Sequence, residues 1–320
     1  MASDAFAPLL GQPQAVELLK AARALNRIAP AYFFVGAAGV GRSLAAKCFV
    51  ELLFSAGVPP AGQQKVQKRL QAGNHPDLLW VEPTYLHQGQ RLSAAEAEKA
   101  GVKRKAPPQI RIEQIREITQ FLGRYPLEAE RNVVVIEQAE TMAEAAANSL
   151  LKTLEEPGQA TVILIAPAPD SLLPTLVSRC QRIPFYGLDS EAMRQVLIKT
   201  NREEILQHPE VLALAQGSPG KAHAGMQYLQ AIPTDLLSKL RSSPQTLRWA
   251  LELARDIDKQ LDTETQLWLV DYLQHSYWER QRQPYPVQQL EQARKYLLGY
   301  AQSRLVWECT LMAMCQAPGF

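Results

Sequence analysis

The sequence is poor in cysteine and lacks the close cysteine pairs of metal-binding and redox motifs. Its four cysteines, at positions 48, 180, 309 and 315, include no C-x-x-C pair. This spacing supports neither a disulfide framework nor a zinc site. We therefore expect free thiols, mostly buried, in a reducing compartment.

Long apolar runs and an excess of one charge are also absent. No run approaches the roughly 20 apolar residues of a membrane helix, and the first ten residues contain Asp4 but no basic leader of a signal peptide. The 34 basic and 32 acidic residues leave a formal net charge of +2, whereas domains that bind DNA alone carry a strong basic excess. We expect a cytoplasmic protein without a membrane segment, whose contacts with nucleic acid are local or shared with partners.

The first half of the chain alternates short apolar runs with amphipathic segments. The apolar runs predict strands at 32–35, 78–81, 133–136, 162–165 and 182–185. The amphipathic segments predict helices at 12–26, 43–54, 113–122, 143–154 and 172–177. Strands that are buried on both faces and alternate with helices are typical of a parallel sheet covered on both sides.

Beyond residue 186 nearly every segment has helical spacing. Helices are predicted at 191–199, 209–216, 221–229, 246–261, 264–279 and 287–313. Pro233 and the Ser-Ser-Pro turn at 242–244 mark a boundary between two helical parts. We therefore predict an α/β domain at 1–186, a helical lid at 187–232 and an all-α bundle at 233–320.

One irregular stretch, residues 83–108, interrupts the α/β domain. It is predicted to be a long loop, and it contains the basic run Lys103-Arg104-Lys105. A solvated insertion is the first interpretation, and contact with DNA is the alternative.

A glycine-rich turn lies between the first predicted strand and the following helix. Residues 36–43 read Gly-Ala-Ala-Gly-Val-Gly-Arg-Ser and fit G-x-x-x-x-G-[basic]-[ST] in the strand–turn–helix setting of a P-loop. Gly36, Gly39 and Gly41 let backbone N–H groups surround a phosphate, and the helix adds its positive end. An ordinary glycine-rich turn is the alternative, but the flanking strand and helix favour a P-loop.

Two elements of this nucleotide site differ from those of a hydrolysing ATPase. Arg42 replaces the lysine that reaches the terminal phosphates, so a planar fork stands in place of a point charge. Ser43 keeps a hydroxyl that can bind Mg²⁺. After the strand at 133–136, Glu137 takes the metal-side position, and Gln138 stands where a carboxylate would accept the proton of the attacking water. We predict a degenerate site that does not hydrolyse ATP. Residual binding of ATP or ADP with Mg²⁺ is possible there, but the protein requires no cofactor.

Three further motifs resemble those of the AAA+ clamp-loader subunits of bacterial DNA polymerase III. They are Asn-His-Pro-Asp at 74–77, Ala-Ala-Asn-Ser-Leu-Leu-Lys-Thr-Leu-Glu-Glu-Pro at 146–157, and Ser-Arg-Cys at 178–180. The resemblance covers about residues 5–230, and the terminal helices match only in character. It implies an AAA+ P-loop module, a small helical lid and a helical collar where the subunits of the loader are held together.

The resemblance also implies a role for Arg179. In the family this arginine crosses a subunit interface and contacts the γ-phosphate of ATP on the neighbouring ATPase subunit, although an arginine after a helix is by itself most often a surface charge. Pro167 and Gly220 occupy positions where the ATPase members of the family carry nucleotide-sensing residues. The loss of these residues resembles the one type of subunit in the family whose nucleotide site is degenerate. The zinc-binding cysteines of the family are missing from 54–67, so zinc is not expected.

The function implied by the resemblance is that of a non-hydrolysing stator of the sliding-clamp loader in DNA replication. Its implied partners are the tau/gamma ATPase subunits, the delta subunit, the sliding clamp and, through the complex, primed DNA, at the nucleoid-associated replisome in the cytoplasm. One alternative is a weakly active ATPase subunit in which Arg42 and Ser43 bind Mg-ATP. Another is a DNA-binding module that acts through the basic run at 103–105.

Overall fold

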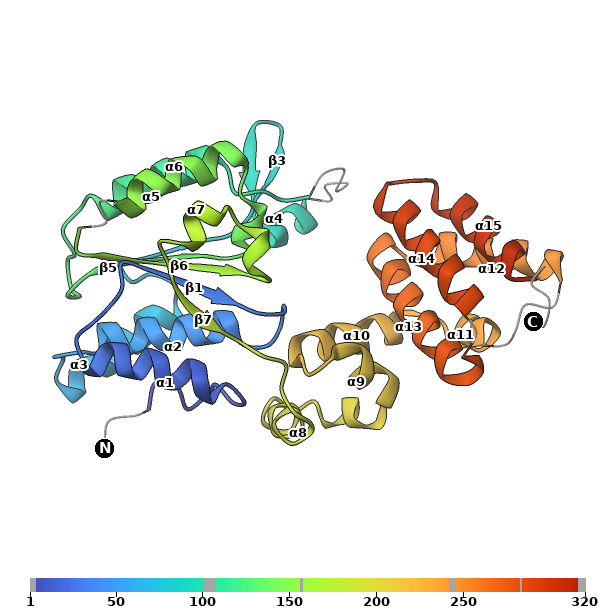
Figure 1. Ribbon diagram of the computed structural model, residues 1–320, viewed down its shortest axis with the longest axis horizontal. Coiled ribbons are helices and arrows are strands. Elements are labelled where there is room, and N and C mark those ends of the chain that lie inside the picture. Colours follow the sequence, from blue (N-terminus) through green and yellow to red (C-terminus); the bar gives the residue numbers. More distant parts are fainter. Residues whose placement is uncertain (1–3, 101–106, 156–157, 242–245, 283, 316–320) are drawn as a thin grey trace. The chain divides into compact units, whose positions relative to one another are not determined.

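The chain forms two compact units, Met1–Ala192 and Met193–Phe320 (Figure 1). The computed structural model describes residues 4–100, 107–155, 158–241, 246–282 and 284–315. Among the helices of these residues, none combines the length and apolarity that crossing a membrane requires.

A five-stranded sheet forms the centre of the first unit, in the order β2-β5-β6-β1-β7. Its strands are β1 Ala31–Val35, β2 Leu78–Val81, β5 Asn132–Ile136, β6 Ala160–Ala166 and β7 Gln181–Pro184. All neighbouring strands are parallel, so their carboxyl ends meet at one edge of the sheet. The predicted parallel sheet is confirmed, with strand positions within two residues of those expected.

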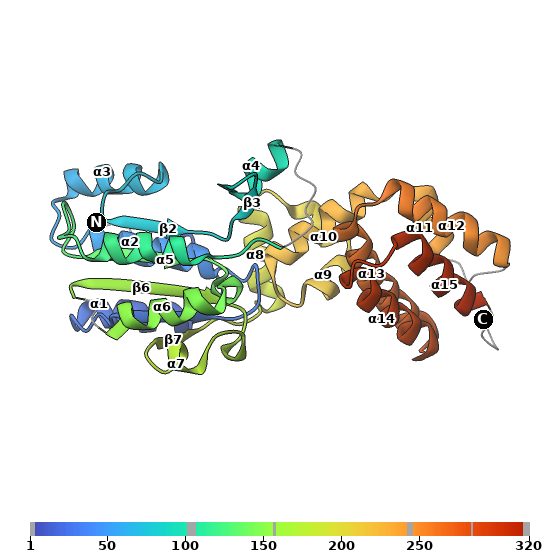
Figure 2. The same cartoon turned by 90° about the horizontal axis from the view of Figure 1, so that it is seen from above.

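Helices cover both faces of this sheet (Figures 1 and 2). One face carries α1 Pro13–Ala24 and α2 Arg42–Phe54, with α3 Pro60–Gln71 packed against α2. The other carries α5 Ile112–Leu122, α6 Glu144–Glu155 and α7 Pro174–Val177. Successive strand residues point to opposite faces, so Phe34 joins the first core and Phe33 the second. The short 3₁₀ helices η1 Ala139–Thr141 and η2 Pro169–Ser171 follow β5 and β6.

The predicted long loop at 83–108 is wrong for its described part. Strands β3 Tyr85–His87 and β4 Gln90–Leu92 form an antiparallel hairpin, followed by helix α4 Ala94–Lys99. Gln88 and Gly89 both have positive φ, at 49° and 80°, as in the type I′ turns that suit a two-residue hairpin. The strands are too short to give a clear alternating pattern. The basic run Lys103-Arg104-Lys105 lies outside the described residues.

The described residues of the second unit form helices joined by turns, without a strand. Its helices are α8 Ser190–Lys199, which begins in the first unit, η3 Glu203–Gln207, α9 Pro209–Ala215, α10 Pro219–Ala231, α11 Thr234–Arg241, α12 Leu247–Gln260, α13 Thr263–Gln281, α14 Pro284–Leu298 and α15 Ser303–Cys315. Glu210 of α9 pairs with Arg241 of α11 at 3.6 Å. The division into a lid at 187–232 and a bundle at 233–320 stays a prediction.

The single helix predicted at 287–313 is wrong, because α14 and α15 are separate helices. The chain turns after Leu298 with Tyr300 at φ +57°, and the Ala301 amide donates to the Tyr296 carbonyl at 3.0 Å in a helix-ending turn. Gly299 precedes the turn, but the apolar spacing continues into α15, which concealed the break.

All four cysteines are free thiols, as expected. The expectation that most are buried is wrong, since only Cys48 is buried, Cys180 and Cys315 are half-buried and Cys309 is exposed. Cys309 lies on the outer side of α15, whose inner side is formed by residues such as Trp307.

Candidate functional site

The predicted P-loop turn connects β1 to α2 at the carboxyl edge of the sheet. Gly36 lies so close to the backbone of Phe185 that a Cβ there would be 2.2 Å from the Phe185 carbonyl oxygen. Gly41 precedes α2 with φ +106°, and no side chain caps the helix. Gly39, with φ +78°, lies between them. The first amides of α2 are therefore left without a capping side chain, which suits an anion.

Arg42, Ser43 and Glu137 come together at this edge, from the start of α2 and the end of β5. Burial raises the pKa of the Glu137 carboxyl, while a hydrogen bond from the Ser43 hydroxyl lowers it. Burial lowers the pKa of the Arg42 guanidinium, and the charges of Glu140 and Glu137 oppose that shift. Among the described residues, the buried Nη1 of Arg42 has no hydrogen-bond partner. The arrangement has a free donor for an acceptor group such as a phosphate oxygen.

Gln138, the residue after Glu137, is exposed and adopts a left-handed conformation at φ +47°. The Glu137 amide donates to the Val81 carbonyl at 2.9 Å, which extends the pairing of β5 with β2. Gln138 then heads η1, where its carbonyl accepts from the Thr141 amide at 2.9 Å. A neutral amide at this point of the edge cannot act as a base toward water.

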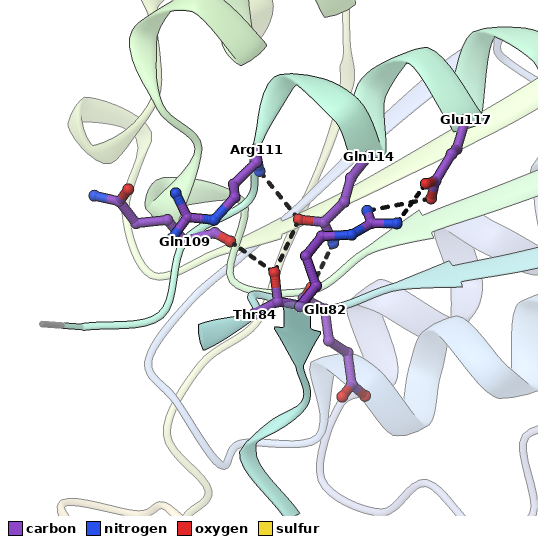
Figure 3. Close-up of polar contacts among 7 residues, drawn as sticks. Glu82, Thr84, Gln109, Arg111, Gln114 and Glu117 are labelled. Carbon is purple, nitrogen blue, oxygen red and sulfur yellow. Dashed lines mark hydrogen bonds and ion pairs between the residues drawn. The ribbon is translucent and has the colours of Figure 1, made fainter. Parts of the chain in front are cut away.

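A polar network holds the carboxyl end of β2 beside the start of α5 (Figure 3). The buried Gln114 side chain accepts hydrogen bonds from the Arg111 amide at 3.0 Å and the Thr84 hydroxyl at 3.3 Å, and donates to the Glu82 carbonyl at 2.9 Å. The Glu82 side chain points away from this network (Figure 3), and its charge contributes to the raised pKa of Glu137. Sequence reasoning missed Gln114, because its partners Thr84 and Glu82 lie 30 and 32 residues away in the sequence.

Gln12, which sequence reasoning also missed, joins the P-loop turn to the chain leaving β7. This side chain, 4% exposed, donates to the Val40 carbonyl at 3.1 Å and the Tyr186 carbonyl at 2.7 Å, and accepts from the Tyr186 amide at 3.2 Å. The amide nitrogen thus donates to two backbone carbonyls and the amide oxygen accepts from one backbone amide. Gln12 therefore fixes the position of the turn.

Arg179 lies at the opposite edge of the sheet from the P-loop turn. It precedes β7, whose first residue Gln181 pairs with Tyr32 near the start of β1, whereas the turn follows the end of β1. The two edges are roughly 15 Å apart along the strand. Arg179 is exposed, and its Nη1 and Nη2 donate to the Thr175 carbonyl and to the Glu155 carboxylate, both at 3.0 Å.

The Asn-His-Pro-Asp motif at 74–77 lies away from the P-loop turn, before β2. The buried Asp77 carboxylate accepts backbone hydrogen bonds from Leu127, Glu128 and Ala129, each at 2.7 Å. The His75 ring packs on Phe54 with centroids 4.4 Å apart. These contacts fix the loop that leads into β5, so the motif has a structural role.

The other predicted positions are distributed between the two units. Pro167 follows β6 at the carboxyl edge of the sheet, while Gly220 lies in the first turn of α10 in the second unit. Among the described residues, no three histidine, cysteine, aspartate or glutamate side chains gather into a metal site. The expectation that zinc is absent stays a prediction.

Comparison with known families finds two matches that together span most of the chain. Residues 11–189 match the family model described as DNA polymerase III, delta subunit. Residues 191–314 match the model described as cyanobacterial DNA polymerase III delta prime, C-terminal domain.

Individual relatives are also similar to this chain. The delta' subunits of DNA polymerase III from Bacillus subtilis and Pseudomonas aeruginosa are each 33% identical, over 191 and 238 residues. These matches cover 59% and 69% of this chain, but only 51% and 66% of those relatives. The chain therefore matches about half of the Bacillus subtilis protein and about two thirds of the Pseudomonas aeruginosa protein.

A solved structure shares the fold. The Thermotoga maritima protein related to the DNA polymerase III gamma subunit superposes with a TM-score of 0.52, at 18% identity, over 95% of this chain and 99% of its own. At this identity the likeness concerns the fold alone, a parallel α/β core followed by helices.

Proposed function

We propose, from the fact that the chain belongs to the delta-prime family of DNA polymerase III subunits, that it is a non-hydrolysing stator of the sliding-clamp loader. In this role it supplies Arg179 in trans to the ATP site of a neighbouring ATPase subunit. The observation that carries the proposal is the separation of Arg179 from the P-loop turn of its own chain, at the opposite edge of the sheet.

The geometry of Arg179 supports service to another subunit. A guanidinium is always charged and presents a rigid fork of donors, which suits charge developing on a transferring phosphoryl group. Arg179 is exposed at its edge of the sheet, and the length of the strands keeps it from reaching the turn after β1. A phosphate that it contacts therefore has to come from outside the chain.

The chain's own P-loop site supports phosphate binding without hydrolysis. The uncapped amides of α2 and the unpartnered Nη1 of Arg42 fit a phosphate group, and the Ser43 hydroxyl beside Glu137 fits Mg²⁺. Bound Mg²⁺ would neutralise phosphate charge. Gln138 offers no base for the attacking water. Any ATP or ADP bound here would therefore remain as a structural ligand, and the proposed function does not require it.

The partners and location belong to the same proposal. The tau/gamma ATPase subunits and the delta subunit would be direct partners in the loader, and the sliding clamp and primed DNA would be reached through the complex. We expect the protein at the replisome in the cytoplasm.

Reconstitution of the loader with tau/gamma and delta tests the proposal. The Arg179→Ala variant is expected to assemble normally while ATPase stimulated by clamp and DNA falls, because the site completed by this chain loses its trans arginine. Arg182→Ala, which removes an exposed arginine from nearby β7, is the matched control and should behave as wild type. Unchanged stimulated ATPase in Arg179→Ala would overturn the trans role.

A weakly active ATPase subunit is the second candidate, favoured by the effect of the Ser43 hydroxyl in lowering the pKa of the Glu137 carboxyl. It predicts saturable ATP hydrolysis by the purified chain that disappears in Ser43→Ala. The stator predicts no such turnover, so this measurement separates the two functions.

A further inference from the structure

The guanidinium of Arg179 is held by two different elements of the first unit. Thr175 of α7 provides a carbonyl acceptor for Nη1, and Glu155, the last residue of α6, provides a carboxylate acceptor for Nη2, both at 3.0 Å. These bonds use only part of the donor set of a guanidinium. The remaining donors are left for a ligand.

The pair of Arg179 and Glu155 contributes little to the stability of the fold. Their side chains are 40% and 54% exposed, and ion pairs in such positions are weakened by water and salt. A free arginine side chain samples many rotamers, however, and it loses this conformational entropy when a phosphate fixes it in one of them. Two anchors on separate helices reduce this loss before binding occurs.

We propose that Glu155 is a positioning residue, which orients Arg179 for contact with the phosphate of a neighbouring subunit. This inference rests on the proposed function of Arg179. Glu155 itself touches no nucleotide, and it acts by holding one terminal nitrogen while the Thr175 carbonyl holds the other. Its position at the carboxyl end of α6 places both residues at the same edge of the sheet.

Three other interpretations of Glu155 predict different results. A carboxylate that competes with the phosphate would restrain Arg179 in an inactive position, and its removal would raise stimulated ATPase. If Glu155 is a surface residue without a role, its replacement changes nothing. If its role is purely structural, its replacement lowers assembly or the melting temperature without a selective effect on kcat.

The test uses the full chain in the reconstituted loader, with Glu155→Gln and with Glu144→Gln as a control at the other end of α6. We expect Glu155→Gln to lower the stimulated kcat about two- to fivefold, the range of an exposed ion pair, with the KM for ATP and assembly unchanged. Glu155→Asp, which keeps the charge, should recover part of the loss. An unchanged or higher kcat in Glu155→Gln overturns the positioning role.

The double variant separates this inference from the proposed function. In an Arg179→Ala background, Glu155→Gln should have no further effect, because the residue that it positions is gone. An additive loss would mean that Glu155 acts by another route. If Arg179→Ala alone leaves stimulated ATPase unchanged, the trans role itself fails, whereas a loss in Arg179→Ala without one in Glu155→Gln refutes only the positioning role.

Discussion

Asp77 and Leu127, fifty residues apart, are joined by a hydrogen bond of 2.7 Å from the Leu127 amide to the Asp77 carboxylate. The same carboxylate accepts from the next two amides and is only 1% exposed. One buried side chain thus fixes three successive backbone groups. The loop nevertheless presents the Tyr125 and Leu127 side chains to solvent, 90% and 79% exposed.

We expect Asp77→Ala to lower the free energy of unfolding by about 3 kcal/mol, because three partly buried amides lose a charged, buried acceptor. Urea unfolding followed by circular dichroism measures this change. Asp170→Ala, which removes an exposed aspartate from η2, should shift stability by less than about 0.5 kcal/mol. Equal stability of the two variants would show that the loop has other support.

Gln12→Ala should loosen the P-loop turn and the chain after β7 together. Loss of the three hydrogen bonds to Val40 and Tyr186 is expected to cost about 2 kcal/mol. Hydrogen exchange of the Tyr186 amide should accelerate, because that amide loses its acceptor. Protection that stays at the wild-type level would contradict the role assigned to Gln12.

Glu137→Gln should stabilise the protein more at neutral than at acidic pH. Burial raises the folded-state pKa of Glu137 above its ordinary value of 4.5, so the folded chain holds this proton more tightly than the unfolded chain. The stability contributed by the protonated carboxyl is therefore present below that ordinary value and is lost as pH rises. Glutamine keeps the neutral form at every pH.

Melting temperatures from about pH 4 to about pH 7 measure this effect. The difference between Glu137→Gln and wild type should grow as pH rises, while Glu144→Gln, at an exposed position, should follow the wild-type curve. Parallel curves for Glu137→Gln and wild type would mean that the charges of Arg42 and Lys47 offset the burial of the carboxylate.

The four thiols should differ strongly in reactivity. Burial raises the pKa of Cys48 to about 11 and that of Cys180 to about 12, so neither forms thiolate at neutral pH. Cys309 is exposed and should be alkylated first by iodoacetamide, as followed by mass spectrometry of the folded protein. Early labelling of Cys180 would be inconsistent with this environment.

The sheet and the P-loop turn were predictable because their signals are local. Strands such as β5 and β6 are buried along their whole length, which produces continuous apolar runs, and parallel pairing brings their ends to one edge. The convergence of Ser43 and Glu137 follows from that topology.

The contacts of Gln12, Asp77 and Arg179 were not predictable in the same way. Most of their partners are distant in the sequence, 24 residues away for Glu155 beside Arg179 and up to 174 residues away for Gln12, and no periodic pattern marks them. The hairpin of β3 and β4 was missed because its strands are only three residues long, too short for an alternating pattern.

The placement of Arg179 and the P-loop turn at opposite edges gives the first unit a direction. Under the proposed function, one side of such a subunit supplies an arginine and the other carries the site that accepts one, so identical contacts can only repeat head to tail. This chain would supply Arg179 to its neighbour, but its own P-loop site does not hydrolyse ATP and needs no arginine from another subunit. It would therefore occupy the terminal place in a row of subunits, and an assembly that includes it would have a defined first member.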